Sequence, residues 1–158
     1  MYDSVRSLLE LVQEAVSPWH TVQAVRKRLS KADFQPLKLG EKWQLESGKS
    51  YYVEAFGSTV LAFTIGCNGY TEANNLRIAA SHTDFPGLRI KPQASVIKDG
   101  YGVLNIESYG GLILASWQDR PLSIAGKITL KGQDAFHPQV RLVDFAKPLL
   151  TIPELAIH

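Results

Sequence analysis

The sequence predicts an α/β fold in which two helices precede a set of strands and the remainder reads as β-structure. Three observations predict it. Apolar residues recur at helical spacing up to about residue 33. Strand-forming residues and turn signals dominate from Trp43 onward, and glycines punctuate the last third of the chain. A change of composition after Pro92 predicts a domain boundary there.

The composition is that of an ordinary folded domain. The 158 residues are 45% apolar and 20% charged, and the formal net charge is +2. This near balance gives no electrostatic reason to expect a nucleic-acid partner. No segment approaches the 18 consecutive apolar residues of a membrane helix, and the single cysteine, Cys67, excludes an internal disulfide. We therefore expect a cytoplasmic protein that binds neither nucleic acid nor membrane.

Two helices are expected at the start of the chain. The apolar stripe of the first is formed by Val5, Leu8, Leu9 and Val12. Asp3 or Ser4 is expected to cap that helix. Ser17-Pro18 ends it, because the residue before a proline is pushed out of the α region. A second helix is expected over about 21–32.

A hairpin is expected after the helices. Residues 49–56 and 59–66 are rich in Tyr, Val, Phe and Thr, and Gly57-Ser58 between them predicts a tight turn.

Further along, Asn68-Gly69 marks another turn. The short apolar run 76–80 predicts a buried strand, and 126–130 predicts one more strand.

The densest chemical signal is the string 81–87, which directly follows the run 76–80. His82 and Asp84 are two residues apart, so an extended backbone places both side chains on one side. The imidazole could bind a metal while the carboxylate orients it. Alternatively, the two could act as a base and its orienting acid, as in a nucleophilic triad. The plainest alternative is that they only stabilise a loop.

Several short blocks stand out along the chain: Ser-Pro-Trp-His (17–20), the strand entry at 43–52, Ser-His-Thr-Asp-Phe-Pro-Gly (81–87), Ser-Tyr-Gly-Gly (108–111), Trp-Gln-Asp-Arg (117–120), Leu-Ser-Ile-Ala-Gly (122–126), Arg-Leu-Val-Asp-Phe (141–145) and Ile-Pro-Glu-Leu-Ala-Ile-His (152–158). Together they resemble the aspartyl aminopeptidase family, a group of dinuclear zinc metallo-aminopeptidases. They occur in the family's order over nearly the whole chain. Phe85, Gln118 and Pro121 depart from the family, which usually has a small residue, an apolar residue and Asp there. The sequence is thus identified as the N-terminal part of a family member.

The resemblance implies an α/β catalytic domain interrupted by an inserted β-rich dimerisation domain. Residues 1–91 would be the N-terminal portion of the catalytic domain, and 92–158 the beginning of the insert. It also implies a homo-oligomer, either a dimer or a higher assembly of dimers.

The resemblance further implies the roles of three residues. His82 would be a zinc ligand, and Asp84 the carboxylate that orients it. His158 would reach the active site of a neighbouring subunit and touch substrate near the scissile carbonyl. A complete centre would hold two zinc ions, and each catalytic zinc needs about three protein ligands. Nothing in this sequence matches the remaining ligands, which the family takes from its C-terminal part.

The function expected from the resemblance is metal-dependent release of N-terminal, preferentially acidic, residues from peptides. As a fragment lacking most metal ligands, this chain alone would be inactive. The alternative is an inactive fragment or scaffold that keeps only the oligomerisation surface. A small Ser or Cys hydrolase is disfavoured, because no Gly-x-Ser-x-Gly elbow is present and Cys67 merely adjoins a turn.

His20 and His137 are expected to be structural or solvent-exposed, and Tyr109 and Trp117 to be packing residues. We also expect the isolated chain to be marginally stable, or to associate through exposed strands, because central strands of the catalytic sheet would be missing.

Overall fold

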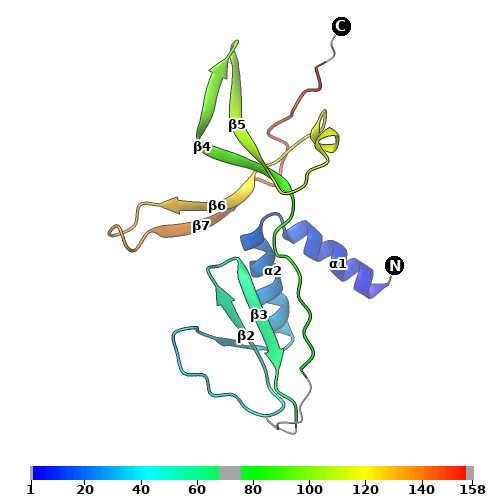
Figure 1. Cartoon of the computed structure of the whole chain (residues 1–158), viewed down its shortest axis with the longest axis vertical. Helices are drawn as coiled ribbons and strands as arrows, with labels where there is room; N and C mark the ends of the chain where they lie inside the picture. Colours follow the sequence, from blue (N-terminus) through cyan, green and yellow to red (C-terminus); the bar gives the residue numbers. More distant parts are fainter. Residues whose placement is uncertain (1, 68–75, 156–158) are drawn as a thin grey trace. The chain divides into compact units, whose positions relative to one another are not determined.

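A computed structural model describes residues 2–67 and 76–155. The chain divides into two compact units, which are described separately. The first contains Met1–Asp84 and Ile124–Phe145, and the second contains Phe85–Ser123 and Ala146–His158. Figure 1 labels the main helices and strands of both units.

Helix α1 (Asp3–Glu14) begins one residue after Tyr2, which occupies the N-cap without a side-chain cap bond. The expectation that Asp3 or Ser4 caps the helix is wrong, because both residues lie within its first turn. Its apolar stripe at positions 5, 8, 9 and 12 is at least 42% exposed. The apolar periodicity therefore predicted the helix correctly, but the described residues do not cover its apolar stripe.

Helix α2 (Pro18–Lys31) begins three residues before the expected start. Ser17 is extended (φ −158°, ψ 164°), and its hydroxyl accepts a long 3.4 Å hydrogen bond from the His20 N–H. Pro18 fits the first helical position because the N–H that it lacks would have no intrahelical partner there. The Ser-Pro pair thus separates α1 from α2 and also starts α2.

An ion pair joins the two helices. Arg28 Nη2 lies 3.1 Å from Glu14 Oε1. The hydrogen bond from the guanidinium lowers the pKa of the Glu14 carboxyl below its ordinary value.

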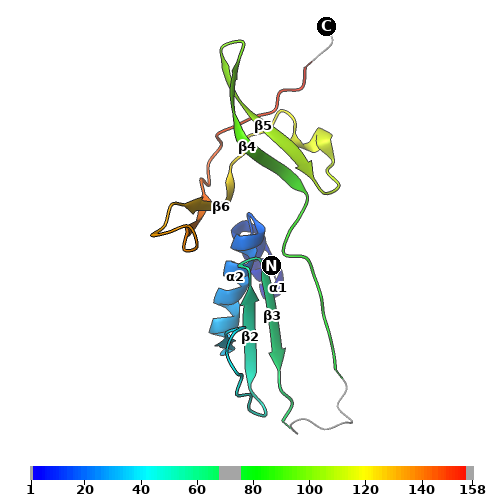
Figure 2. The same cartoon turned by 60° about the vertical axis from the view of Figure 1, so that its left-hand side comes forward.

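Three strands form the sheet of the first unit, in the order β1 (Gln35–Leu37), β2 (Ser50–Ala55) and β3 (Thr59–Thr64). Strand β1 is parallel to β2, and β3 is antiparallel to it. Helix α2 lies along this sheet (Figure 2). The buried apolar residues of the unit are Val22, Ala24, Tyr51, Tyr52, Val53 and Ile65. These residues lie on α2, on β2 and directly after β3.

The β2–β3 turn differs in detail from the expected Gly57-Ser58 turn. Its central residues are Phe56 (φ 56°) and Gly57 (φ 69°), and the Ser58 N–H donates to the Ala55 carbonyl at 3.3 Å. Two consecutive positive φ values are the signature of a type I′ turn. For a bulky L-residue this backbone region costs about 1–2 kcal/mol.

The run 76–80 is not a buried strand, which corrects the expectation from its apolar composition. Leu76 and Ile78 are 82% and 79% exposed, and no described residue pairs with this run in a sheet. A strand needs a neighbour for its backbone groups, and the described part of the chain places none beside these residues.

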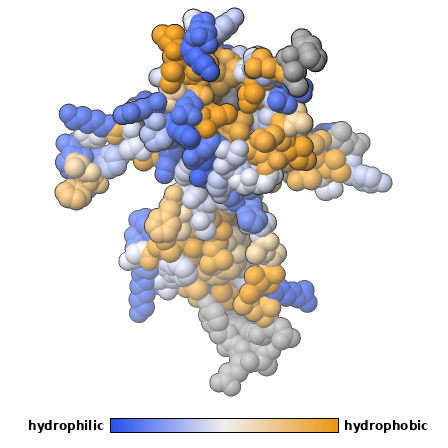
Figure 3. Space-filling model, turned by 45° about the horizontal axis from the view of Figure 1, so that its top comes forward, coloured by the Kyte–Doolittle hydropathy of each residue, from blue (hydrophilic) through white to orange (hydrophobic). Residues whose placement is uncertain are grey.

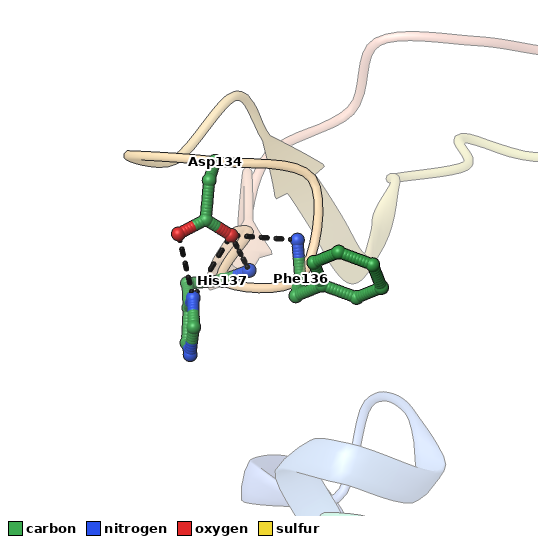
Figure 4. A network of polar contacts seen from close by, with 3 residues as sticks. All are labelled: Asp134, Phe136 and His137. Carbon is green, nitrogen blue, oxygen red and sulfur yellow. Dashed lines mark hydrogen bonds and ion pairs between the residues drawn. The ribbon is translucent and has the colours of Figure 1, made fainter.

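The first unit also contains a second hairpin, formed by β6 (Ala125–Leu130) and β7 (Gln139–Asp144). The strand expected at 126–130 is confirmed. The Asp134 carboxylate organises the loop by accepting hydrogen bonds from the N–H groups of Phe136 (2.8 Å) and His137 (3.0 Å) (Figure 4). It also bonds His137 Nδ1 at 2.8 Å.

The second unit is built on the antiparallel hairpin of β4 (Gly87–Lys98) and β5 (Tyr101–Tyr109), followed by the 3-10 helix η1 (Leu114–Trp117). The β-rich character expected after Pro92 is seen here, although β4 runs through that position. The compact units divide between Asp84 and Phe85. The domain assignment 1–91 and 92–158 stays a prediction.

Large apolar side chains remain exposed in both units, and many are visible as orange surface in Figure 3. Among the described residues, no helix is both long and apolar enough to cross a membrane.

Candidate functional site

The structure brings the two central site residues together. His82 Nδ1 lies 3.0 Å from Asp84 Oδ1, and the two side chains are 88% and 31% exposed. Between them, the Thr83 hydroxyl donates a 2.8 Å hydrogen bond to the Ser58 carbonyl in the β2–β3 turn. This bond anchors the middle of the segment that carries His82 and Asp84 to the β2–β3 turn.

The contact determines which ring nitrogen is available for chemistry. A carboxylate accepts hydrogen bonds, so it favours the tautomer in which His82 Nδ1 carries the proton. The lone pair is then on Nε2 of an exposed ring. This is the state in which an imidazole binds a metal while a carboxylate fixes its orientation.

The same arrangement would also suit a general base, which the sequence left open. A nucleophile would then have to donate to the free ring nitrogen. Among the described residues, no hydroxyl or thiol is hydrogen-bonded to the His82 ring, which contacts the Asp84 carboxylate. The contacts therefore favour an oriented metal ligand over a triad.

The described residues do not form a complete zinc site. Over 2–67 and 76–155, no group of three or more His, Cys, Asp or Glu side chains is arranged to hold a metal ion. A catalytic zinc needs about three protein ligands, and His82 is one. His158 lies outside the described residues.

The other histidines are engaged by local partners. His20 Nδ1 lies 2.7 Å from the Ser17 hydroxyl at the start of α2. The His137–Asp134 contact is a second imidazole–carboxylate pair, which the sequence analysis did not identify. An Asp three residues before a His in a hairpin loop is the signal that could have found it. The hydrogen bonds to His137 hold the pKa of the Asp134 carboxyl below its ordinary value, with a further contribution from the Phe136 N–H.

The two aromatic residues expected to be structural lie in the second unit. The Arg89 guanidinium carbon lies 3.5 Å from the centre of the Tyr109 ring, across the β4–β5 hairpin. This cation–π contact gives Tyr109 a packing role. Trp117 ends η1 and is half-buried.

One protein family matches nearly the whole of this chain. The family model described as "Aminopeptidase I zinc metalloprotease (M18)" matches residues 11–158. A protein of Clostridium novyi named "Probable M18 family aminopeptidase 2" is 42% identical over 152 residues, covering 96% of this chain and 35% of that protein.

Two solved structures resemble the fold closely. A chain in the cryo-EM structure of the Ape4 and Nbr1 complex superposes with a TM-score of 0.88 at 37% identity, covering 95% of this chain and 29% of that chain. The mApe1 dodecamer of S. cerevisiae gives a TM-score of 0.80 at 26% identity, covering 97% and 36%. This chain thus spans about a third of the length of the proteins that it matches.

Proposed function

The chain belongs to the aminopeptidase I zinc metalloprotease family (M18). We propose that it forms part of a zinc-dependent aminopeptidase that releases N-terminal residues from peptides. The observation that carries the proposal for this site is the 3.0 Å contact between His82 and Asp84 on an exposed segment. It leaves one ring nitrogen available and oriented, as a metal ligand requires.

In this proposal His82 binds zinc through Nε2, and Asp84 is a positioning residue that holds the ring through Nδ1–H. The other ligands of a two-zinc centre would lie outside the described residues. Support for this division comes from the absence of a third ligating side chain near the pair among those residues. The chain by itself would then bind zinc weakly and would not hydrolyse peptides.

Four finer features belong to the same proposal. Preference for acidic N-terminal residues is supported by the resemblance to aspartyl aminopeptidases. Assembly into a homo-oligomer is supported by the similarity to the mApe1 dodecamer. His158 would contact substrate in a neighbouring subunit, and a cytoplasmic location agrees with the single cysteine.

The second candidate is a non-catalytic scaffold that keeps only the assembly surface. The same observation, one imidazole without further ligands among the described residues, favours it for the isolated chain. The two candidates differ in whether His82 binds zinc.

Zinc titration with a competing chelator tests the proposal on this chain and on His82→Gln. We expect weak binding of zinc, weakened about 10-fold or more by the substitution because a ligand is removed. His137→Gln is the matched control, since His137 is also exposed and paired with a carboxylate. Equal zinc affinity in the parent and His82→Gln would contradict the metal role.

The activity itself is tested on a polypeptide in which this chain is followed by the C-terminal part of a family member, which supplies the remaining metal ligands. We expect hydrolysis of aspartyl and glutamyl anilides that needs zinc and is lost in His82→Gln. If His82→Gln hydrolyses the anilides as fast as the parent does, the catalytic centre does not use His82.

A further inference from the structure

A groove in the first compact unit contains side chains that the proposed zinc site does not use. It encloses about 340 Å³ between α2, the β2–β3 turn and the β6–β7 hairpin. Its apolar walls are Trp19 and Val22 on α2 and Val140 and Leu142 on β7. The groove is therefore a hollow of the size that takes one or two large side chains.

Phe56 stands on the rim of this groove and is 93% exposed. Its backbone has φ 56°, which a bulky side chain rarely adopts. The β4–β5 turn has the same positive-φ pair and uses Asp99-Gly100, the residues that such turns favour. Neither turn chemistry nor core packing among the described residues explains an aromatic ring at position 56. A ring kept exposed on a strained turn is typical of a contact surface.

Charges of both signs border the same groove. Arg26 Nη1 lies 3.3 Å from Glu54 Oε1, and Lys127 Nζ lies 4.8 Å from the centre of the Trp19 ring. Arg26 and Glu54 are only partly buried. A partner with a protruding aromatic ring and charges of both signs would match this rim.

A second copy of this chain is such a partner. We propose that Phe56 of each copy enters the groove of the other around a two-fold axis, an inference that rests on the proposed homo-oligomer and specifies one of its surfaces. A two-fold contact uses the same patch on both copies, and here the knob, the hollow and both charges lie on one patch. Glu54 of one copy then faces Lys127 of the other.

The expected strength follows from the area. An aromatic side chain buries about 150–250 Å², so two Phe56 rings supply about 300–500 Å². A stable interface buries about 1,200–2,000 Å² in total. Even with the groove walls included, the contact is at the weak end, and dimerisation should appear at roughly micromolar to millimolar concentration.

Sedimentation velocity over a concentration series of the 158-residue chain tests the proposal. The diagnostic substitution is Phe56→Asn, because Asn is the residue that a positive-φ turn favours. We expect the dimer dissociation constant to rise about 30-fold or more, as for a central aromatic anchor, while the thermal midpoint stays equal or rises. Loss of association therefore could not be attributed to misfolding.

Phe136→Asn is the matched control, since Phe136 is 90% exposed on the other hairpin loop of the same unit. It should leave the dissociation constant unchanged. A monomeric parent throughout the series, unchanged association in Phe56→Asn, or an equal loss in Phe136→Asn would each overturn the proposal. None of these readouts depends on zinc, so failure here is distinguishable from failure of the proposed aminopeptidase.

Discussion

The imidazole of His82 and the carboxylate of Asp84 face each other, with Nδ1 3.0 Å from Oδ1, on a segment that belongs to no strand of the described residues. The segment is held at its centre instead, by the bond from Thr83 to the β2–β3 turn. The hydrogen bond of Thr83, and not pairing with a neighbouring strand, therefore holds the segment that carries His82 and Asp84.

Removing the carboxylate should release the His82 ring. In Asp84→Ala we expect zinc affinity to fall about 10- to 100-fold, since loss of an orienting carboxylate has effects of this size. Nitrogen-15 NMR of the imidazole should show the proton on Nδ1 in the parent and a shift toward Nε2 in the variant. Asp84→Asn keeps an accepting oxygen and should fall between the two. Identical tautomer populations in all three proteins would argue against the orienting role.

The cap of α2 should contribute measurably to stability. Ser17 is buried, and Ser17→Ala removes the acceptor for the His20 N–H together with the hydroxyl that bonds the His20 ring. We expect the free energy of unfolding to fall by about 1 kcal/mol in a denaturant titration. Ser4→Ala is the control, because no side chain caps α1. A larger loss in the control would contradict the assignment.

Gly132 should be required for the β6–β7 loop. A Cβ there would overlap the carbonyl oxygen of His137 and would lie 2.8 Å from its carbonyl carbon. We expect Gly132→Ala to lower the free energy of unfolding by about 1–3 kcal/mol, the usual cost of overpacking. Gly126→Ala in the same hairpin meets nothing within 4 Å and serves as the control. Chemical denaturation of both variants measures the difference.

The Asp134 loop should make stability depend on acid pH. Hydrogen bonds from His137 and Phe136 hold the pKa of the Asp134 carboxyl below its ordinary value in the folded chain. Because the unfolded chain takes up the proton first, the contribution is present above the unfolded pKa and is lost as pH falls through the folded pKa. Asp134→Asn should remove this part of the pH dependence in acid denaturation. A pKa of the Asp134 carboxyl at or above the ordinary aspartate value in an NMR titration would contradict the contact.

Local patterns predicted the local elements well. The apolar period gave α1, and Ser17-Pro18 gave the break between the helices, because proline restricts the residue before it wherever it occurs. The hairpin expected around Gly57 forms, with its turn one residue earlier than expected.

Patterns that need a distant partner were less informative. The run 76–80 has the composition of a buried strand but is exposed, because strand pairing depends on residues far away in sequence. The pairing of His137 with Asp134 and the groove behind Phe56 also escaped the sequence analysis. Both depend on how a loop or a hairpin is placed in space.

By itself the sequence determined the family, the positions of the two helices and of the hairpin around Gly57, and the presence of an imidazole two residues from a carboxylate, because each of these is a short-range or ordered pattern along the chain. Only the tertiary structure decided that Thr83 is tied to the Ser58 carbonyl and that the His82 ring stays exposed beside Asp84. It also decided that β6 and β7 join the first unit next to α2. These relations join residues that are far apart in the chain, and such contacts are set by packing and hydrogen bonding of the folded chain, which no local pattern records.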